Sequence, residues 1–432
     1  MDQTCSHCRL GRRDFIRLSF GAAAGAATFA NLGLAWPPAF AEASAGRQDA
    51  KGKAKAVILL WMQGAPSQLD TFDPKPGTDT GGPFKAIDTA VPGIRICEHL
   101  PRLAKQMKKF SIIRTLNSRD PNHDTAAYLL HTGYRRSETV DHPHFGSIVT
   151  NELGMPAEGL PGCVTIGGDD GIGSGYLPQD RTPFIVEKME NPLEDLKLAA
   201  GVTKYRLDDR EALLNAQNQR FAKEHDERKV EAHLKAYERA LALIRSPHVK
   251  AFDVSHEPEA VRKLYGSSNF GKACLMARRL VQAGTRFVEV RLADWDTHAD
   301  NFNRTQKLMG DLDPGFAGLL EDLDRTGMLS ETLVLWMGEF GRTPRVNAAN
   351  GRDHFTRAWS VAMAGAGLQG GRVVGATNKE GTEVAERPVP VVDYYATLYE
   401  CLGIDTKKQF TTSTGRPVKI LDEGSPVKEL LS

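Results

Sequence analysis

The stretch "LVLWMGEFGRTPRV", residues 333–346, is the part of the sequence that decides the fold. It opens with an apolar run, 333–337, which Gly338 ends. A short continuous apolar run closed by glycine is typical of a strand that is buried on both faces, as in a parallel sheet covered by helices. Glu339 and Arg342 follow this strand directly. The pattern therefore predicts that charged side chains gather at the carboxyl end of a central strand.

Similar apolar runs recur along the chain and alternate with helix-like segments. The first of them, residues 57–62, is followed by Gln63 and then Gly64. Further strands are expected at 110–116, 162–168, 285–292 and 359–365, and helices at 98–109, 271–284, 303–327 and 391–403 and from Asn122 or Asp124 to near Gly133. This alternation predicts an α/β fold with a mostly parallel central sheet and helices on both faces.

One segment does not follow this alternation of strands and helices. Residues 205–245 are rich in charge, nearly free of glycine and proline, and composed of strong helix formers. We expect a helical insertion or hairpin at about 205–250, beside the sheet and with most of its charges solvated. Residues 56–432 are otherwise expected to form one large domain, although the length also allows two.

The N-terminal segment has the features of an export signal. Twin arginines, Arg12 and Arg13, precede a weakly hydrophobic run of alanine and glycine and then small residues suited to cleavage. Residues 1–45 are interpreted as a twin-arginine signal peptide and 46–55 as a linker; the alternative is an uncleaved membrane anchor. This interpretation implies the twin-arginine translocase as a partner, a periplasmic or extracellular location, and a mature chain without a membrane span.

The overall composition is that of an ordinary soluble globular protein. The chain has 432 residues, of which 41% are hydrophobic and 25% charged, and a net charge of +1. The chain has no large overall excess of positive charge that would attract nucleic acid, so no nucleic-acid partner is expected. Cys5 and Cys8 lie within the signal region. The other cysteines are far apart in apolar surroundings, which favours buried thiols over a disulfide framework: Cys97, Cys163, Cys274 and Cys401.

Three polar clusters follow expected strands, at 63–73, 294–301 and 338–355. The carboxyl ends of parallel strands share one edge of a sheet, so these clusters are expected to converge. Their carboxylates and imidazoles suit divalent metals such as Zn, Ca, Mg or Mn. Two such ions could polarise a phosphoryl or sulfuryl oxygen and activate water. The candidate ligands are Asp296, His298, Glu339 and His354.

Each of these candidates also has a purely structural interpretation. Glu339 could cap the turn after its strand or pair with Arg342. Arg342 could instead clamp an anion, because its forked donors match phosphate and sulfate oxygens. His298 and His354 could be hydrogen-bonded structural histidines, and His123 could stabilise the start of a helix.

Several other polar residues are weaker candidates. His131 is expected to pack within a helix. His142 and His144 flank a proline and are expected to lie in a turn into the next helix. Asp70 and Asp73 are either turn acids or ligands, and the residue types do not choose between the two.

Six segments form a specific combination: "GAPSQLDTFDPKP", "HTGY", "EPEAVRKLYG", "ARRLVQAGTRFVEV", "WDTHADNF" and "GEFGRTPRVN…GRDH". Together they resemble an exported bacterial family labelled domain of unknown function 1501, over nearly all of the chain after the signal. That family is assigned to the alkaline phosphatase and sulfatase superfamily. The resemblance thus implies that superfamily's fold and a metal-dependent hydrolase of sulfate or phosphate esters, with no substrate assigned.

The superfamily pattern also implies places for individual residues. Glu339 stands where the pattern has a metal-binding aspartate, and Phe340 where it has the neighbouring histidine. "DWDTH" resembles the motif Asp-x-x-x-His, read as Asp294 and His298, although Asp296 is the acid in the family-like "WDTH". His354 in "GRDHF" resembles the late histidine ligand.

The nucleophile position departs from the superfamily pattern. Counting back from Gly133 places His123 there, whereas sulfatases carry Cys or Ser and phosphatases carry Ser or Thr. Thr125 lies two residues further on. His123 is therefore a candidate general base or nucleophile, and direct attack by metal-activated water is a further route.

Two functions remain open from the sequence. The first is an exported metal-dependent hydrolase of sulfate or phosphate esters, including those of sulfated or phosphorylated polysaccharides. In that case His123 and Arg342 act as catalytic residues beside the four candidate metal ligands. The second is a non-catalytic protein of the same fold that binds an anionic glycan or a partner at the cell surface.

Overall fold

The computed structural model describes residues 54–156, 159–189, 192, 201–222 and 227–431. The expected signal peptide and nearly all of the expected linker lie outside these residues. Within the described part, no helix is both long enough and apolar enough to span a lipid bilayer.

A nine-stranded sheet forms the centre of the fold. Its main order is β12-β4-β11-β8-β1-β7-β5-β6, and β15 also pairs with β4. The strands are β1 (Ala56–Met62), β4 (Phe110–Asn117), β5 (Cys163–Ile166), β6 (Phe184–Val186), β7 (Phe287–Leu292), β8 (Thr332–Met337), β11 (Trp359–Ala364), β12 (Val373–Val374) and β15 (Val389–Pro390). The apolar run of the opening stretch is thus β8, next to β1.

The sheet is mostly parallel, as predicted. β1 pairs in parallel with β7 and β8, and β5 pairs in parallel with β7 and β6. β11 runs antiparallel to both of its neighbours, β8 and β4. The segment that connects β8 to β11 contains no helix, so the chain turns back beside β8 instead of crossing over the sheet.

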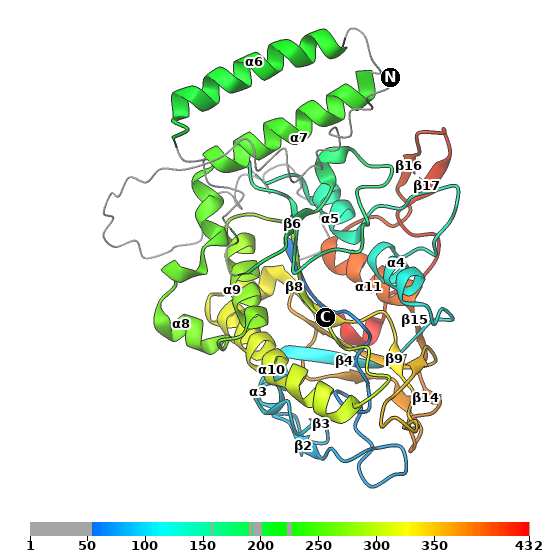
Figure 1. The fold of residues 1–432 in the computed structure, drawn as a ribbon. Coiled ribbons are helices and arrows are strands. Elements are labelled where there is room, and N and C mark those ends of the chain that lie inside the picture. Colours follow the sequence, from blue (N-terminus) through cyan, green and yellow to red (C-terminus); the bar gives the residue numbers. More distant parts are fainter. Residues whose placement is uncertain (1–53, 157–158, 190–191, 193–200, 223–226, 432) are drawn as a thin grey trace, which may run out of the picture.

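Helices cover both faces of the sheet, which confirms the predicted α/β class. Ile58 and Leu60 of β1 belong to an apolar layer shared with α9 and α10, whereas Leu59 and Trp61 belong to the opposite layer, shared with α4, α5 and α11 (Figure 1). The helices are α3 (Pro101–Gln106), α4 (His123–Thr132), α5 (Phe145–Leu153), α8 (Glu259–Leu264), α9 (Asn269–Gln282), α10 (Asn301–Arg325) and α11 (Val391–Leu402).

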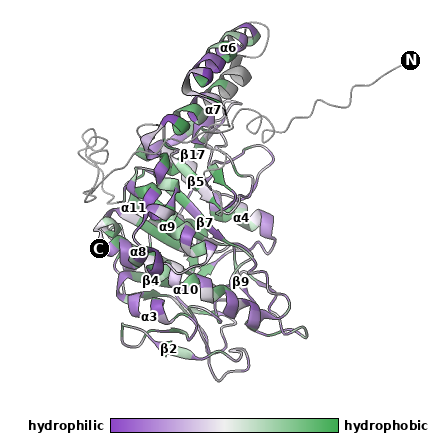
Figure 2. Ribbon diagram, turned by 60° about the vertical axis from the view of Figure 1, so that its left-hand side comes forward, coloured by the Kyte–Doolittle hydropathy of each residue, from purple (hydrophilic) through white to green (hydrophobic). Residues whose placement is uncertain are grey.

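The charged segment forms two long helices, α6 (Lys204–Ala222) and α7 (Glu227–Arg245). They project from the body of the molecule, as Figure 2 shows. The helical insertion expected there is confirmed, and the chain returns to the sheet through the short 3-10 helix Pro247–Phe252.

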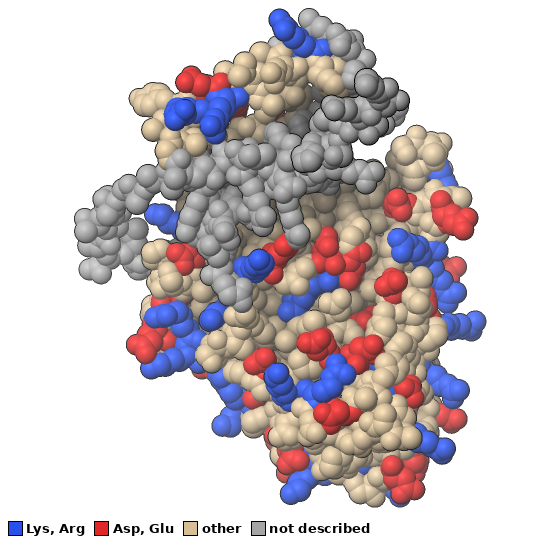
Figure 3. Space-filling view, viewed as in Figure 1, with Lys and Arg blue, Asp and Glu red and all other residues tan. Residues whose placement is uncertain are grey.

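The described residues also form four two-stranded sheets apart from the central sheet. They are β2 (Ala86–Asp88) with β3 (Arg95–Cys97), β9 (Gly341–Arg342) with β10 (His354–Phe355), β13 (Ala376–Thr377) with β14 (Val384–Glu386), and β16 (Gln409–Thr411) with β17 (Pro417–Lys419). On the face seen in Figure 3, basic and acidic side chains are interspersed, so charge matters locally and not as one broad field.

Candidate metal centre

The predicted site residues come together at the carboxyl edge of the parallel strands. Asp296 and His298 lie in the loop after β7, and Glu339 follows β8. His123 is the first residue of α4, which Asn122 caps by accepting hydrogen bonds from two backbone N–H groups. β10 carries His354 opposite Arg342 of β9.

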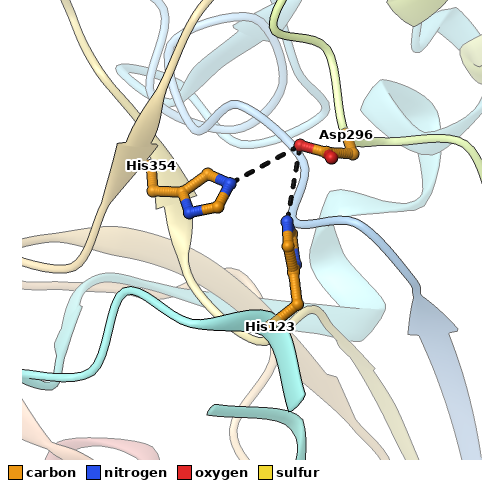
Figure 4. A group of neighbouring side chains, drawn as sticks. All are labelled: His123, Asp296 and His354. Carbon is orange, nitrogen blue, oxygen red and sulfur yellow. Dashed lines mark ion pairs between the residues drawn. The ribbon is translucent and has the colours of Figure 1, made fainter. Parts of the chain in front are cut away.

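One carboxylate oxygen, Oδ1 of Asp296, lies at the centre of the group. The Nε2 atoms of His298, His123 and His354 lie 3.2, 3.4 and 3.6 Å from it. Figure 4 shows His123 and His354 pointing toward this oxygen from separate elements. Asp296, His123 and His354 offer ligand atoms within 4.8 Å of one another, the spacing of a potential metal site.

The outer nitrogen of each imidazole is held by an oxygen acceptor. Nδ1 of His123 lies 2.6 Å from Oε1 of Glu339, and Nδ1 of His298 lies 2.7 Å from Oδ1 of Asp353. Nδ1 of His354 lies 2.6 Å from the Pro121 carbonyl oxygen. In metal sites, acceptors of this kind fix the tautomer that leaves Nε2 free for the ion.

The imidazoles of His298 and His354 lie close to each other. Nε2 of His298 lies 2.9 Å from Nε2 of His354. Because both Nδ1 atoms donate to oxygens, each neutral ring presents a lone pair at Nε2. Two facing lone pairs repel, so this arrangement needs a proton or a cation near both nitrogens. The buried Nε2 of His123 also has no hydrogen-bond partner among the described residues.

Glu339 is a buried residue that positions His123 in the candidate site. It is 2% exposed, and its Oε1 accepts hydrogen bonds from the Gly64 N–H and from His123. Its Oε2 is buried and has no partner within the described part of the chain. Glu339 thus orients His123 and keeps a second oxygen available at the same edge.

Arg342 lies in a different position from the one an anion clamp requires. Its side chain is 0% exposed and donates to the carbonyl oxygens of Gly64, Ala65 and Arg352. Its Nη2 lies 2.5 Å from Oδ1 of Asp296. The buried guanidinium therefore fixes the Asp296 carboxylate and leaves no exposed donor for a substrate.

The local environment favours the cation-binding protonation states of Asp296 and His354 but not that of His123: burial lowers the pKa of His123, and Glu339 raises it above its usual value. Burial raises the pKa of Asp296, but the charge and hydrogen bond of Arg342 outweigh this effect and hold the pKa below its usual value. Burial lowers the pKa of His354, and nearby Arg342 adds to that effect. An ionised aspartate and a neutral histidine are the forms that ligate metal.

Phe340, the residue that the sequence resemblance aligns with a histidine, packs against two imidazoles of the site. Its ring centroid lies 4.8 Å from that of His123 and 4.7 Å from that of His354. Phe340 is fully buried, so it forms an apolar floor beneath the two imidazoles. The position that lacks a ligand thus contributes packing that limits how these rings can turn.

The weaker candidates have structural partners. Asp70 is buried, with its Oδ2 2.7 Å from Nε of Arg352 and 2.9 Å from Nδ2 of Asn301. Asp73 is buried and pairs with Lys75 and accepts from Thr377. Both therefore stabilise the 63–73 loop rather than face the site.

A second cluster, which the sequence did not suggest, lies inside the core. Oε2 of Glu289 is 3.1 Å from Nε2 of His131 and 3.2 Å from Nε2 of His144, and its Oε1 is 2.7 Å from Nε of Arg291. Arg291 also pairs with Asp170. Histidines expected only to pack or to enter a helix thus serve a buried carboxylate.

The second cluster does not fit a metal ion. Nδ1 of His144 accepts the Gly146 N–H at 3.0 Å, so its Nε2 carries the ring proton and donates to Glu289. That proton occupies the lone-pair position a metal would need. Glu289, His131 and His144 are therefore best described as a buried hydrogen-bonded ion network.

One protein family matches the whole of the described part of the chain. The family described as "Protein of unknown function (DUF1501)" matches residues 54–431. The chain belongs to this family. The segments quoted from the sequence for that resemblance lie within the matched range, and no curated protein matches the chain.

Solved structures similar to this DUF1501 chain include a sulfatase from Pseudoalteromonas sp., with 13% identity, coverage of 84% of this chain and 70% of that one, and a TM-score of 0.40. The lipoteichoic acid synthase LtaP from Listeria monocytogenes has 10% identity, coverage of 86% and 75%, and a TM-score of 0.36. Alkaline phosphatase from the Antarctic bacterium TAB5 has 14% identity, coverage of 75% and 95%, and a TM-score of 0.33. At these values the likeness assigns no activity to this chain.

A glycine in the loop after β1 is expected to be essential for the site of this DUF1501 protein. Gly64 has φ +102°, and a Cβ there would lie 2.5 Å from the Asp296 nitrogen. We expect Gly64→Ala to push these loops apart and to weaken metal binding by at least about tenfold, because its N–H also holds Glu339. Metal titration of the purified protein measures this loss.

Gly327→Ala is the matched control. Gly327 also has a positive φ, of +75°, but a Cβ there meets nothing within 4 Å. Both variants carry the backbone strain of an alanine at positive φ. Equal metal affinity in the two variants would show that the close contact at Gly64 is unimportant.

Proposed function

We propose that this chain is a metal-dependent hydrolase of sulfate or phosphate esters that acts after export by the twin-arginine route. The carrying observation is the convergence of three imidazole Nε2 atoms on one Asp296 oxygen, with each Nδ1 held by an oxygen acceptor. The facing Nε2 atoms of His298 and His354 need a proton or a cation near both of them, and a metal ion would supply that cation.

Three residues would hold the ion, His123, His354 and Asp296, and His298 lies beside them with its Nε2 2.9 Å from that of His354. This nitrogen-rich set suits zinc better than calcium or magnesium, which prefer oxygen ligands. When bound, a divalent ion would supply polarisation of an ester oxygen and activation of water. Hydrolysis then forms a bond from the water oxygen to sulfur or phosphorus, and the departing alkoxide takes a proton from that water.

The other residues of the chain prepare this chemistry. Glu339 accepts a hydrogen bond from Nδ1 of His123 and keeps Nε2 directed at the site. Arg342 holds the Asp296 carboxylate in place and in its ionised form. Phe340 keeps water from one side of the His123 and His354 rings, because it is fully buried against both. Preorganised groups of this kind stabilise charge without reorganising during the reaction.

The second candidate function is binding without turnover. It is favoured by the position of Thr125, the hydroxyl closest in sequence to the expected nucleophile. Its N–H and hydroxyl both donate to Asn122 in the cap of α4. A covalent route would require this hydroxyl to give up its contact with Asn122, so the hydrolytic proposal relies on water as the nucleophile.

Metal analysis of the folded, exported protein tests the proposal. We expect about one or two stoichiometric divalent ions per chain and turnover of chromogenic phosphate or sulfate esters that a chelator abolishes and added zinc restores. Protein with bound metal but no turnover of any ester would support the binding function. Protein that binds no divalent metal would refute the hydrolase.

A further inference from the structure

A large cleft opens beside the candidate metal centre. It encloses about 1140 Å³ and is lined by the start of α4, the loop after β7 and the glycine-rich segment 169–175. His123, Asp296 and Glu339 belong to its wall. A substrate whose ester group lies at these residues would therefore place its alcohol portion in this cleft.

The wall of the cleft is strongly acidic. Seven carboxylates and two arginines, Arg136 and Arg304, line it. The carboxylates are Asp124, Asp141, Asp169, Asp170, Asp294, Asp296 and Glu339. The excess of negative charge is local, because the whole chain has a net charge of +1.

Three of the seven carboxylates are neutralised or engaged inside the protein. Asp296 pairs with Arg342, Asp170 pairs with Arg291, and Glu339 accepts from His123. A divalent ion at the metal centre would add positive charge beside Asp296 and Glu339. The part of the cleft at the metal centre is thus suited to the anionic sulfate or phosphate group.

The other carboxylates of the cleft wall lack such partners. These four carboxylates are exposed, and no described basic side chain forms an ion pair with them: Asp124, Asp141, Asp169 and Asp294. The two arginines offset only part of this negative charge, and neither is paired with one of the four carboxylates. Arg304 donates to the backbone carbonyl oxygens of Asp294 and Asp296, and Arg136 lies 5.5 Å from the centre of the Tyr128 ring.

We propose that the alcohol portion of the substrate carries a positive charge, as in an amino alcohol or an amino sugar. This inference rests on the proposed ester hydrolysis and narrows its substrate class. Ionised carboxylates attract an ammonium group and accept its hydrogen bonds. They repel a polyanion, so a heavily sulfated or phosphorylated polysaccharide fits this cleft poorly.

Three esters of similar size test the proposal on the metal-loaded protein. They are 2-aminoethyl, 2-hydroxyethyl and carboxymethyl esters, each prepared as the phosphate and as the sulfate. We expect kcat/KM to fall in that order, by on the order of tenfold at each step at low salt, and the differences to shrink as salt is added. A flat or reversed order would overturn the proposal while leaving ester hydrolysis intact.

Charge-matched variants test whether the four unpaired carboxylates of the cleft cause the preference. The double variant Asp124→Asn with Asp169→Asn is expected to lose most of the preference for the aminoethyl ester. Asp79→Asn with Glu386→Gln removes the same charge from exposed positions outside the cleft and is expected to keep it. Equal preferences in the two double variants would contradict a role for the cleft.

The test remains decisive if no ester is turned over. In that case the proposed hydrolysis fails, and the intact esters serve as ligands for titration calorimetry. Tighter binding of 2-aminoethyl than of 2-hydroxyethyl phosphate, lost in the Asp124 and Asp169 double variant, would support a cation-selective cleft. Equal binding of the two esters would refute it.

Discussion

Replacing Asp296 by asparagine is expected to remove the bound metal and to reduce ester hydrolysis by more than about 100-fold. Loss of groups that only orient metal ligands costs about 10- to 100-fold, and Asp296 lies at the centre of the ligand set. Asparagine retains an Oδ1 atom that accepts from Arg342, so the buried guanidinium keeps a partner. Elemental analysis and steady-state kinetics measure the two losses.

Asp300→Asn is the control for this change. Asp300 lies in the same loop, is exposed and has φ +50°, a conformation that asparagine also adopts readily. The control removes one negative charge close to the site without touching the ligand set. If both variants retain metal and turnover, the assignment of Asp296 is refuted.

Replacing Glu289 by glutamine is expected to lower the free energy of unfolding by about 3–5 kcal/mol. Glu289 is fully buried between His131, His144 and Arg291. The glutamine has nearly the same shape but no charge, so His131 and Arg291 lose their buried counter-ion. Urea denaturation at pH 5.5 to 6 measures the change.

The size of this effect is expected to depend on pH. Burial raises the pKa of Glu289, but His131 and Arg291 outweigh it and hold the pKa well below the usual value. A depressed carboxyl pKa contributes stability above the unfolded value, about 4.3, which is lost as the pH falls toward the folded value. Burial lowers the pKa of His131, but Glu289 raises it above its usual value. That contribution is complete below about pH 6.5 and is lost as the pH rises.

The difference between the native protein and Glu289→Gln should therefore be largest between about pH 4.3 and 6.5. Glu259→Gln provides the comparison, because Glu259 forms only an exposed ion pair with Lys263. That pair should contribute less than about 1 kcal/mol. A Glu289 variant as stable as the Glu259 variant at all pH values would contradict a stabilising role for the buried network.

Much of the fold could be predicted because its elements have strong local signals. Asn122 and Gly133 mark the two ends of α4, since one caps the first turn and the other adopts a left-handed conformation. The apolar run that became β8 marks a central strand. The direction of β11 could not be predicted in the same way, because an apolar sequence does not indicate whether its strand runs parallel or antiparallel to its neighbours. The absence of a helical pattern between β8 and β11 was the available signal.

The convergence of the candidate residues could be predicted for a topological reason. Residues far apart in sequence, such as His123, Asp296 and Glu339, follow or face parallel strands whose ends share one edge. Their individual roles depend on which atoms meet. The burial of Arg342 and its carbonyl partners arise from loop packing that residue types do not reveal. Asp353 was next to a candidate ligand, but adjacency did not indicate that it orients His298.

The second cluster escaped prediction because its members looked ordinary in isolation. Glu289 and Arg291 alternate with apolar residues in β7, a pattern that usually marks a solvated face. α4 and α5 cover that face and turn it into core. Only the packing of His131 and His144 against the strand supplies the partners that a buried carboxylate requires.

The short pairing of β9 with β10 has a consequence for how long the site persists. Only two residue pairs join these strands, and one of them places His354 opposite Arg342. So small a ladder has little stability of its own, whereas the nine-stranded sheet opens only with the whole fold. Amide hydrogens of this hairpin should therefore exchange with solvent through local opening, long before those of β1 or β8. The lifetime of the assembled ligand set is then governed by the hairpin that closes it, and a bound ion would lengthen that lifetime by joining His354 to the rigid edge of the sheet.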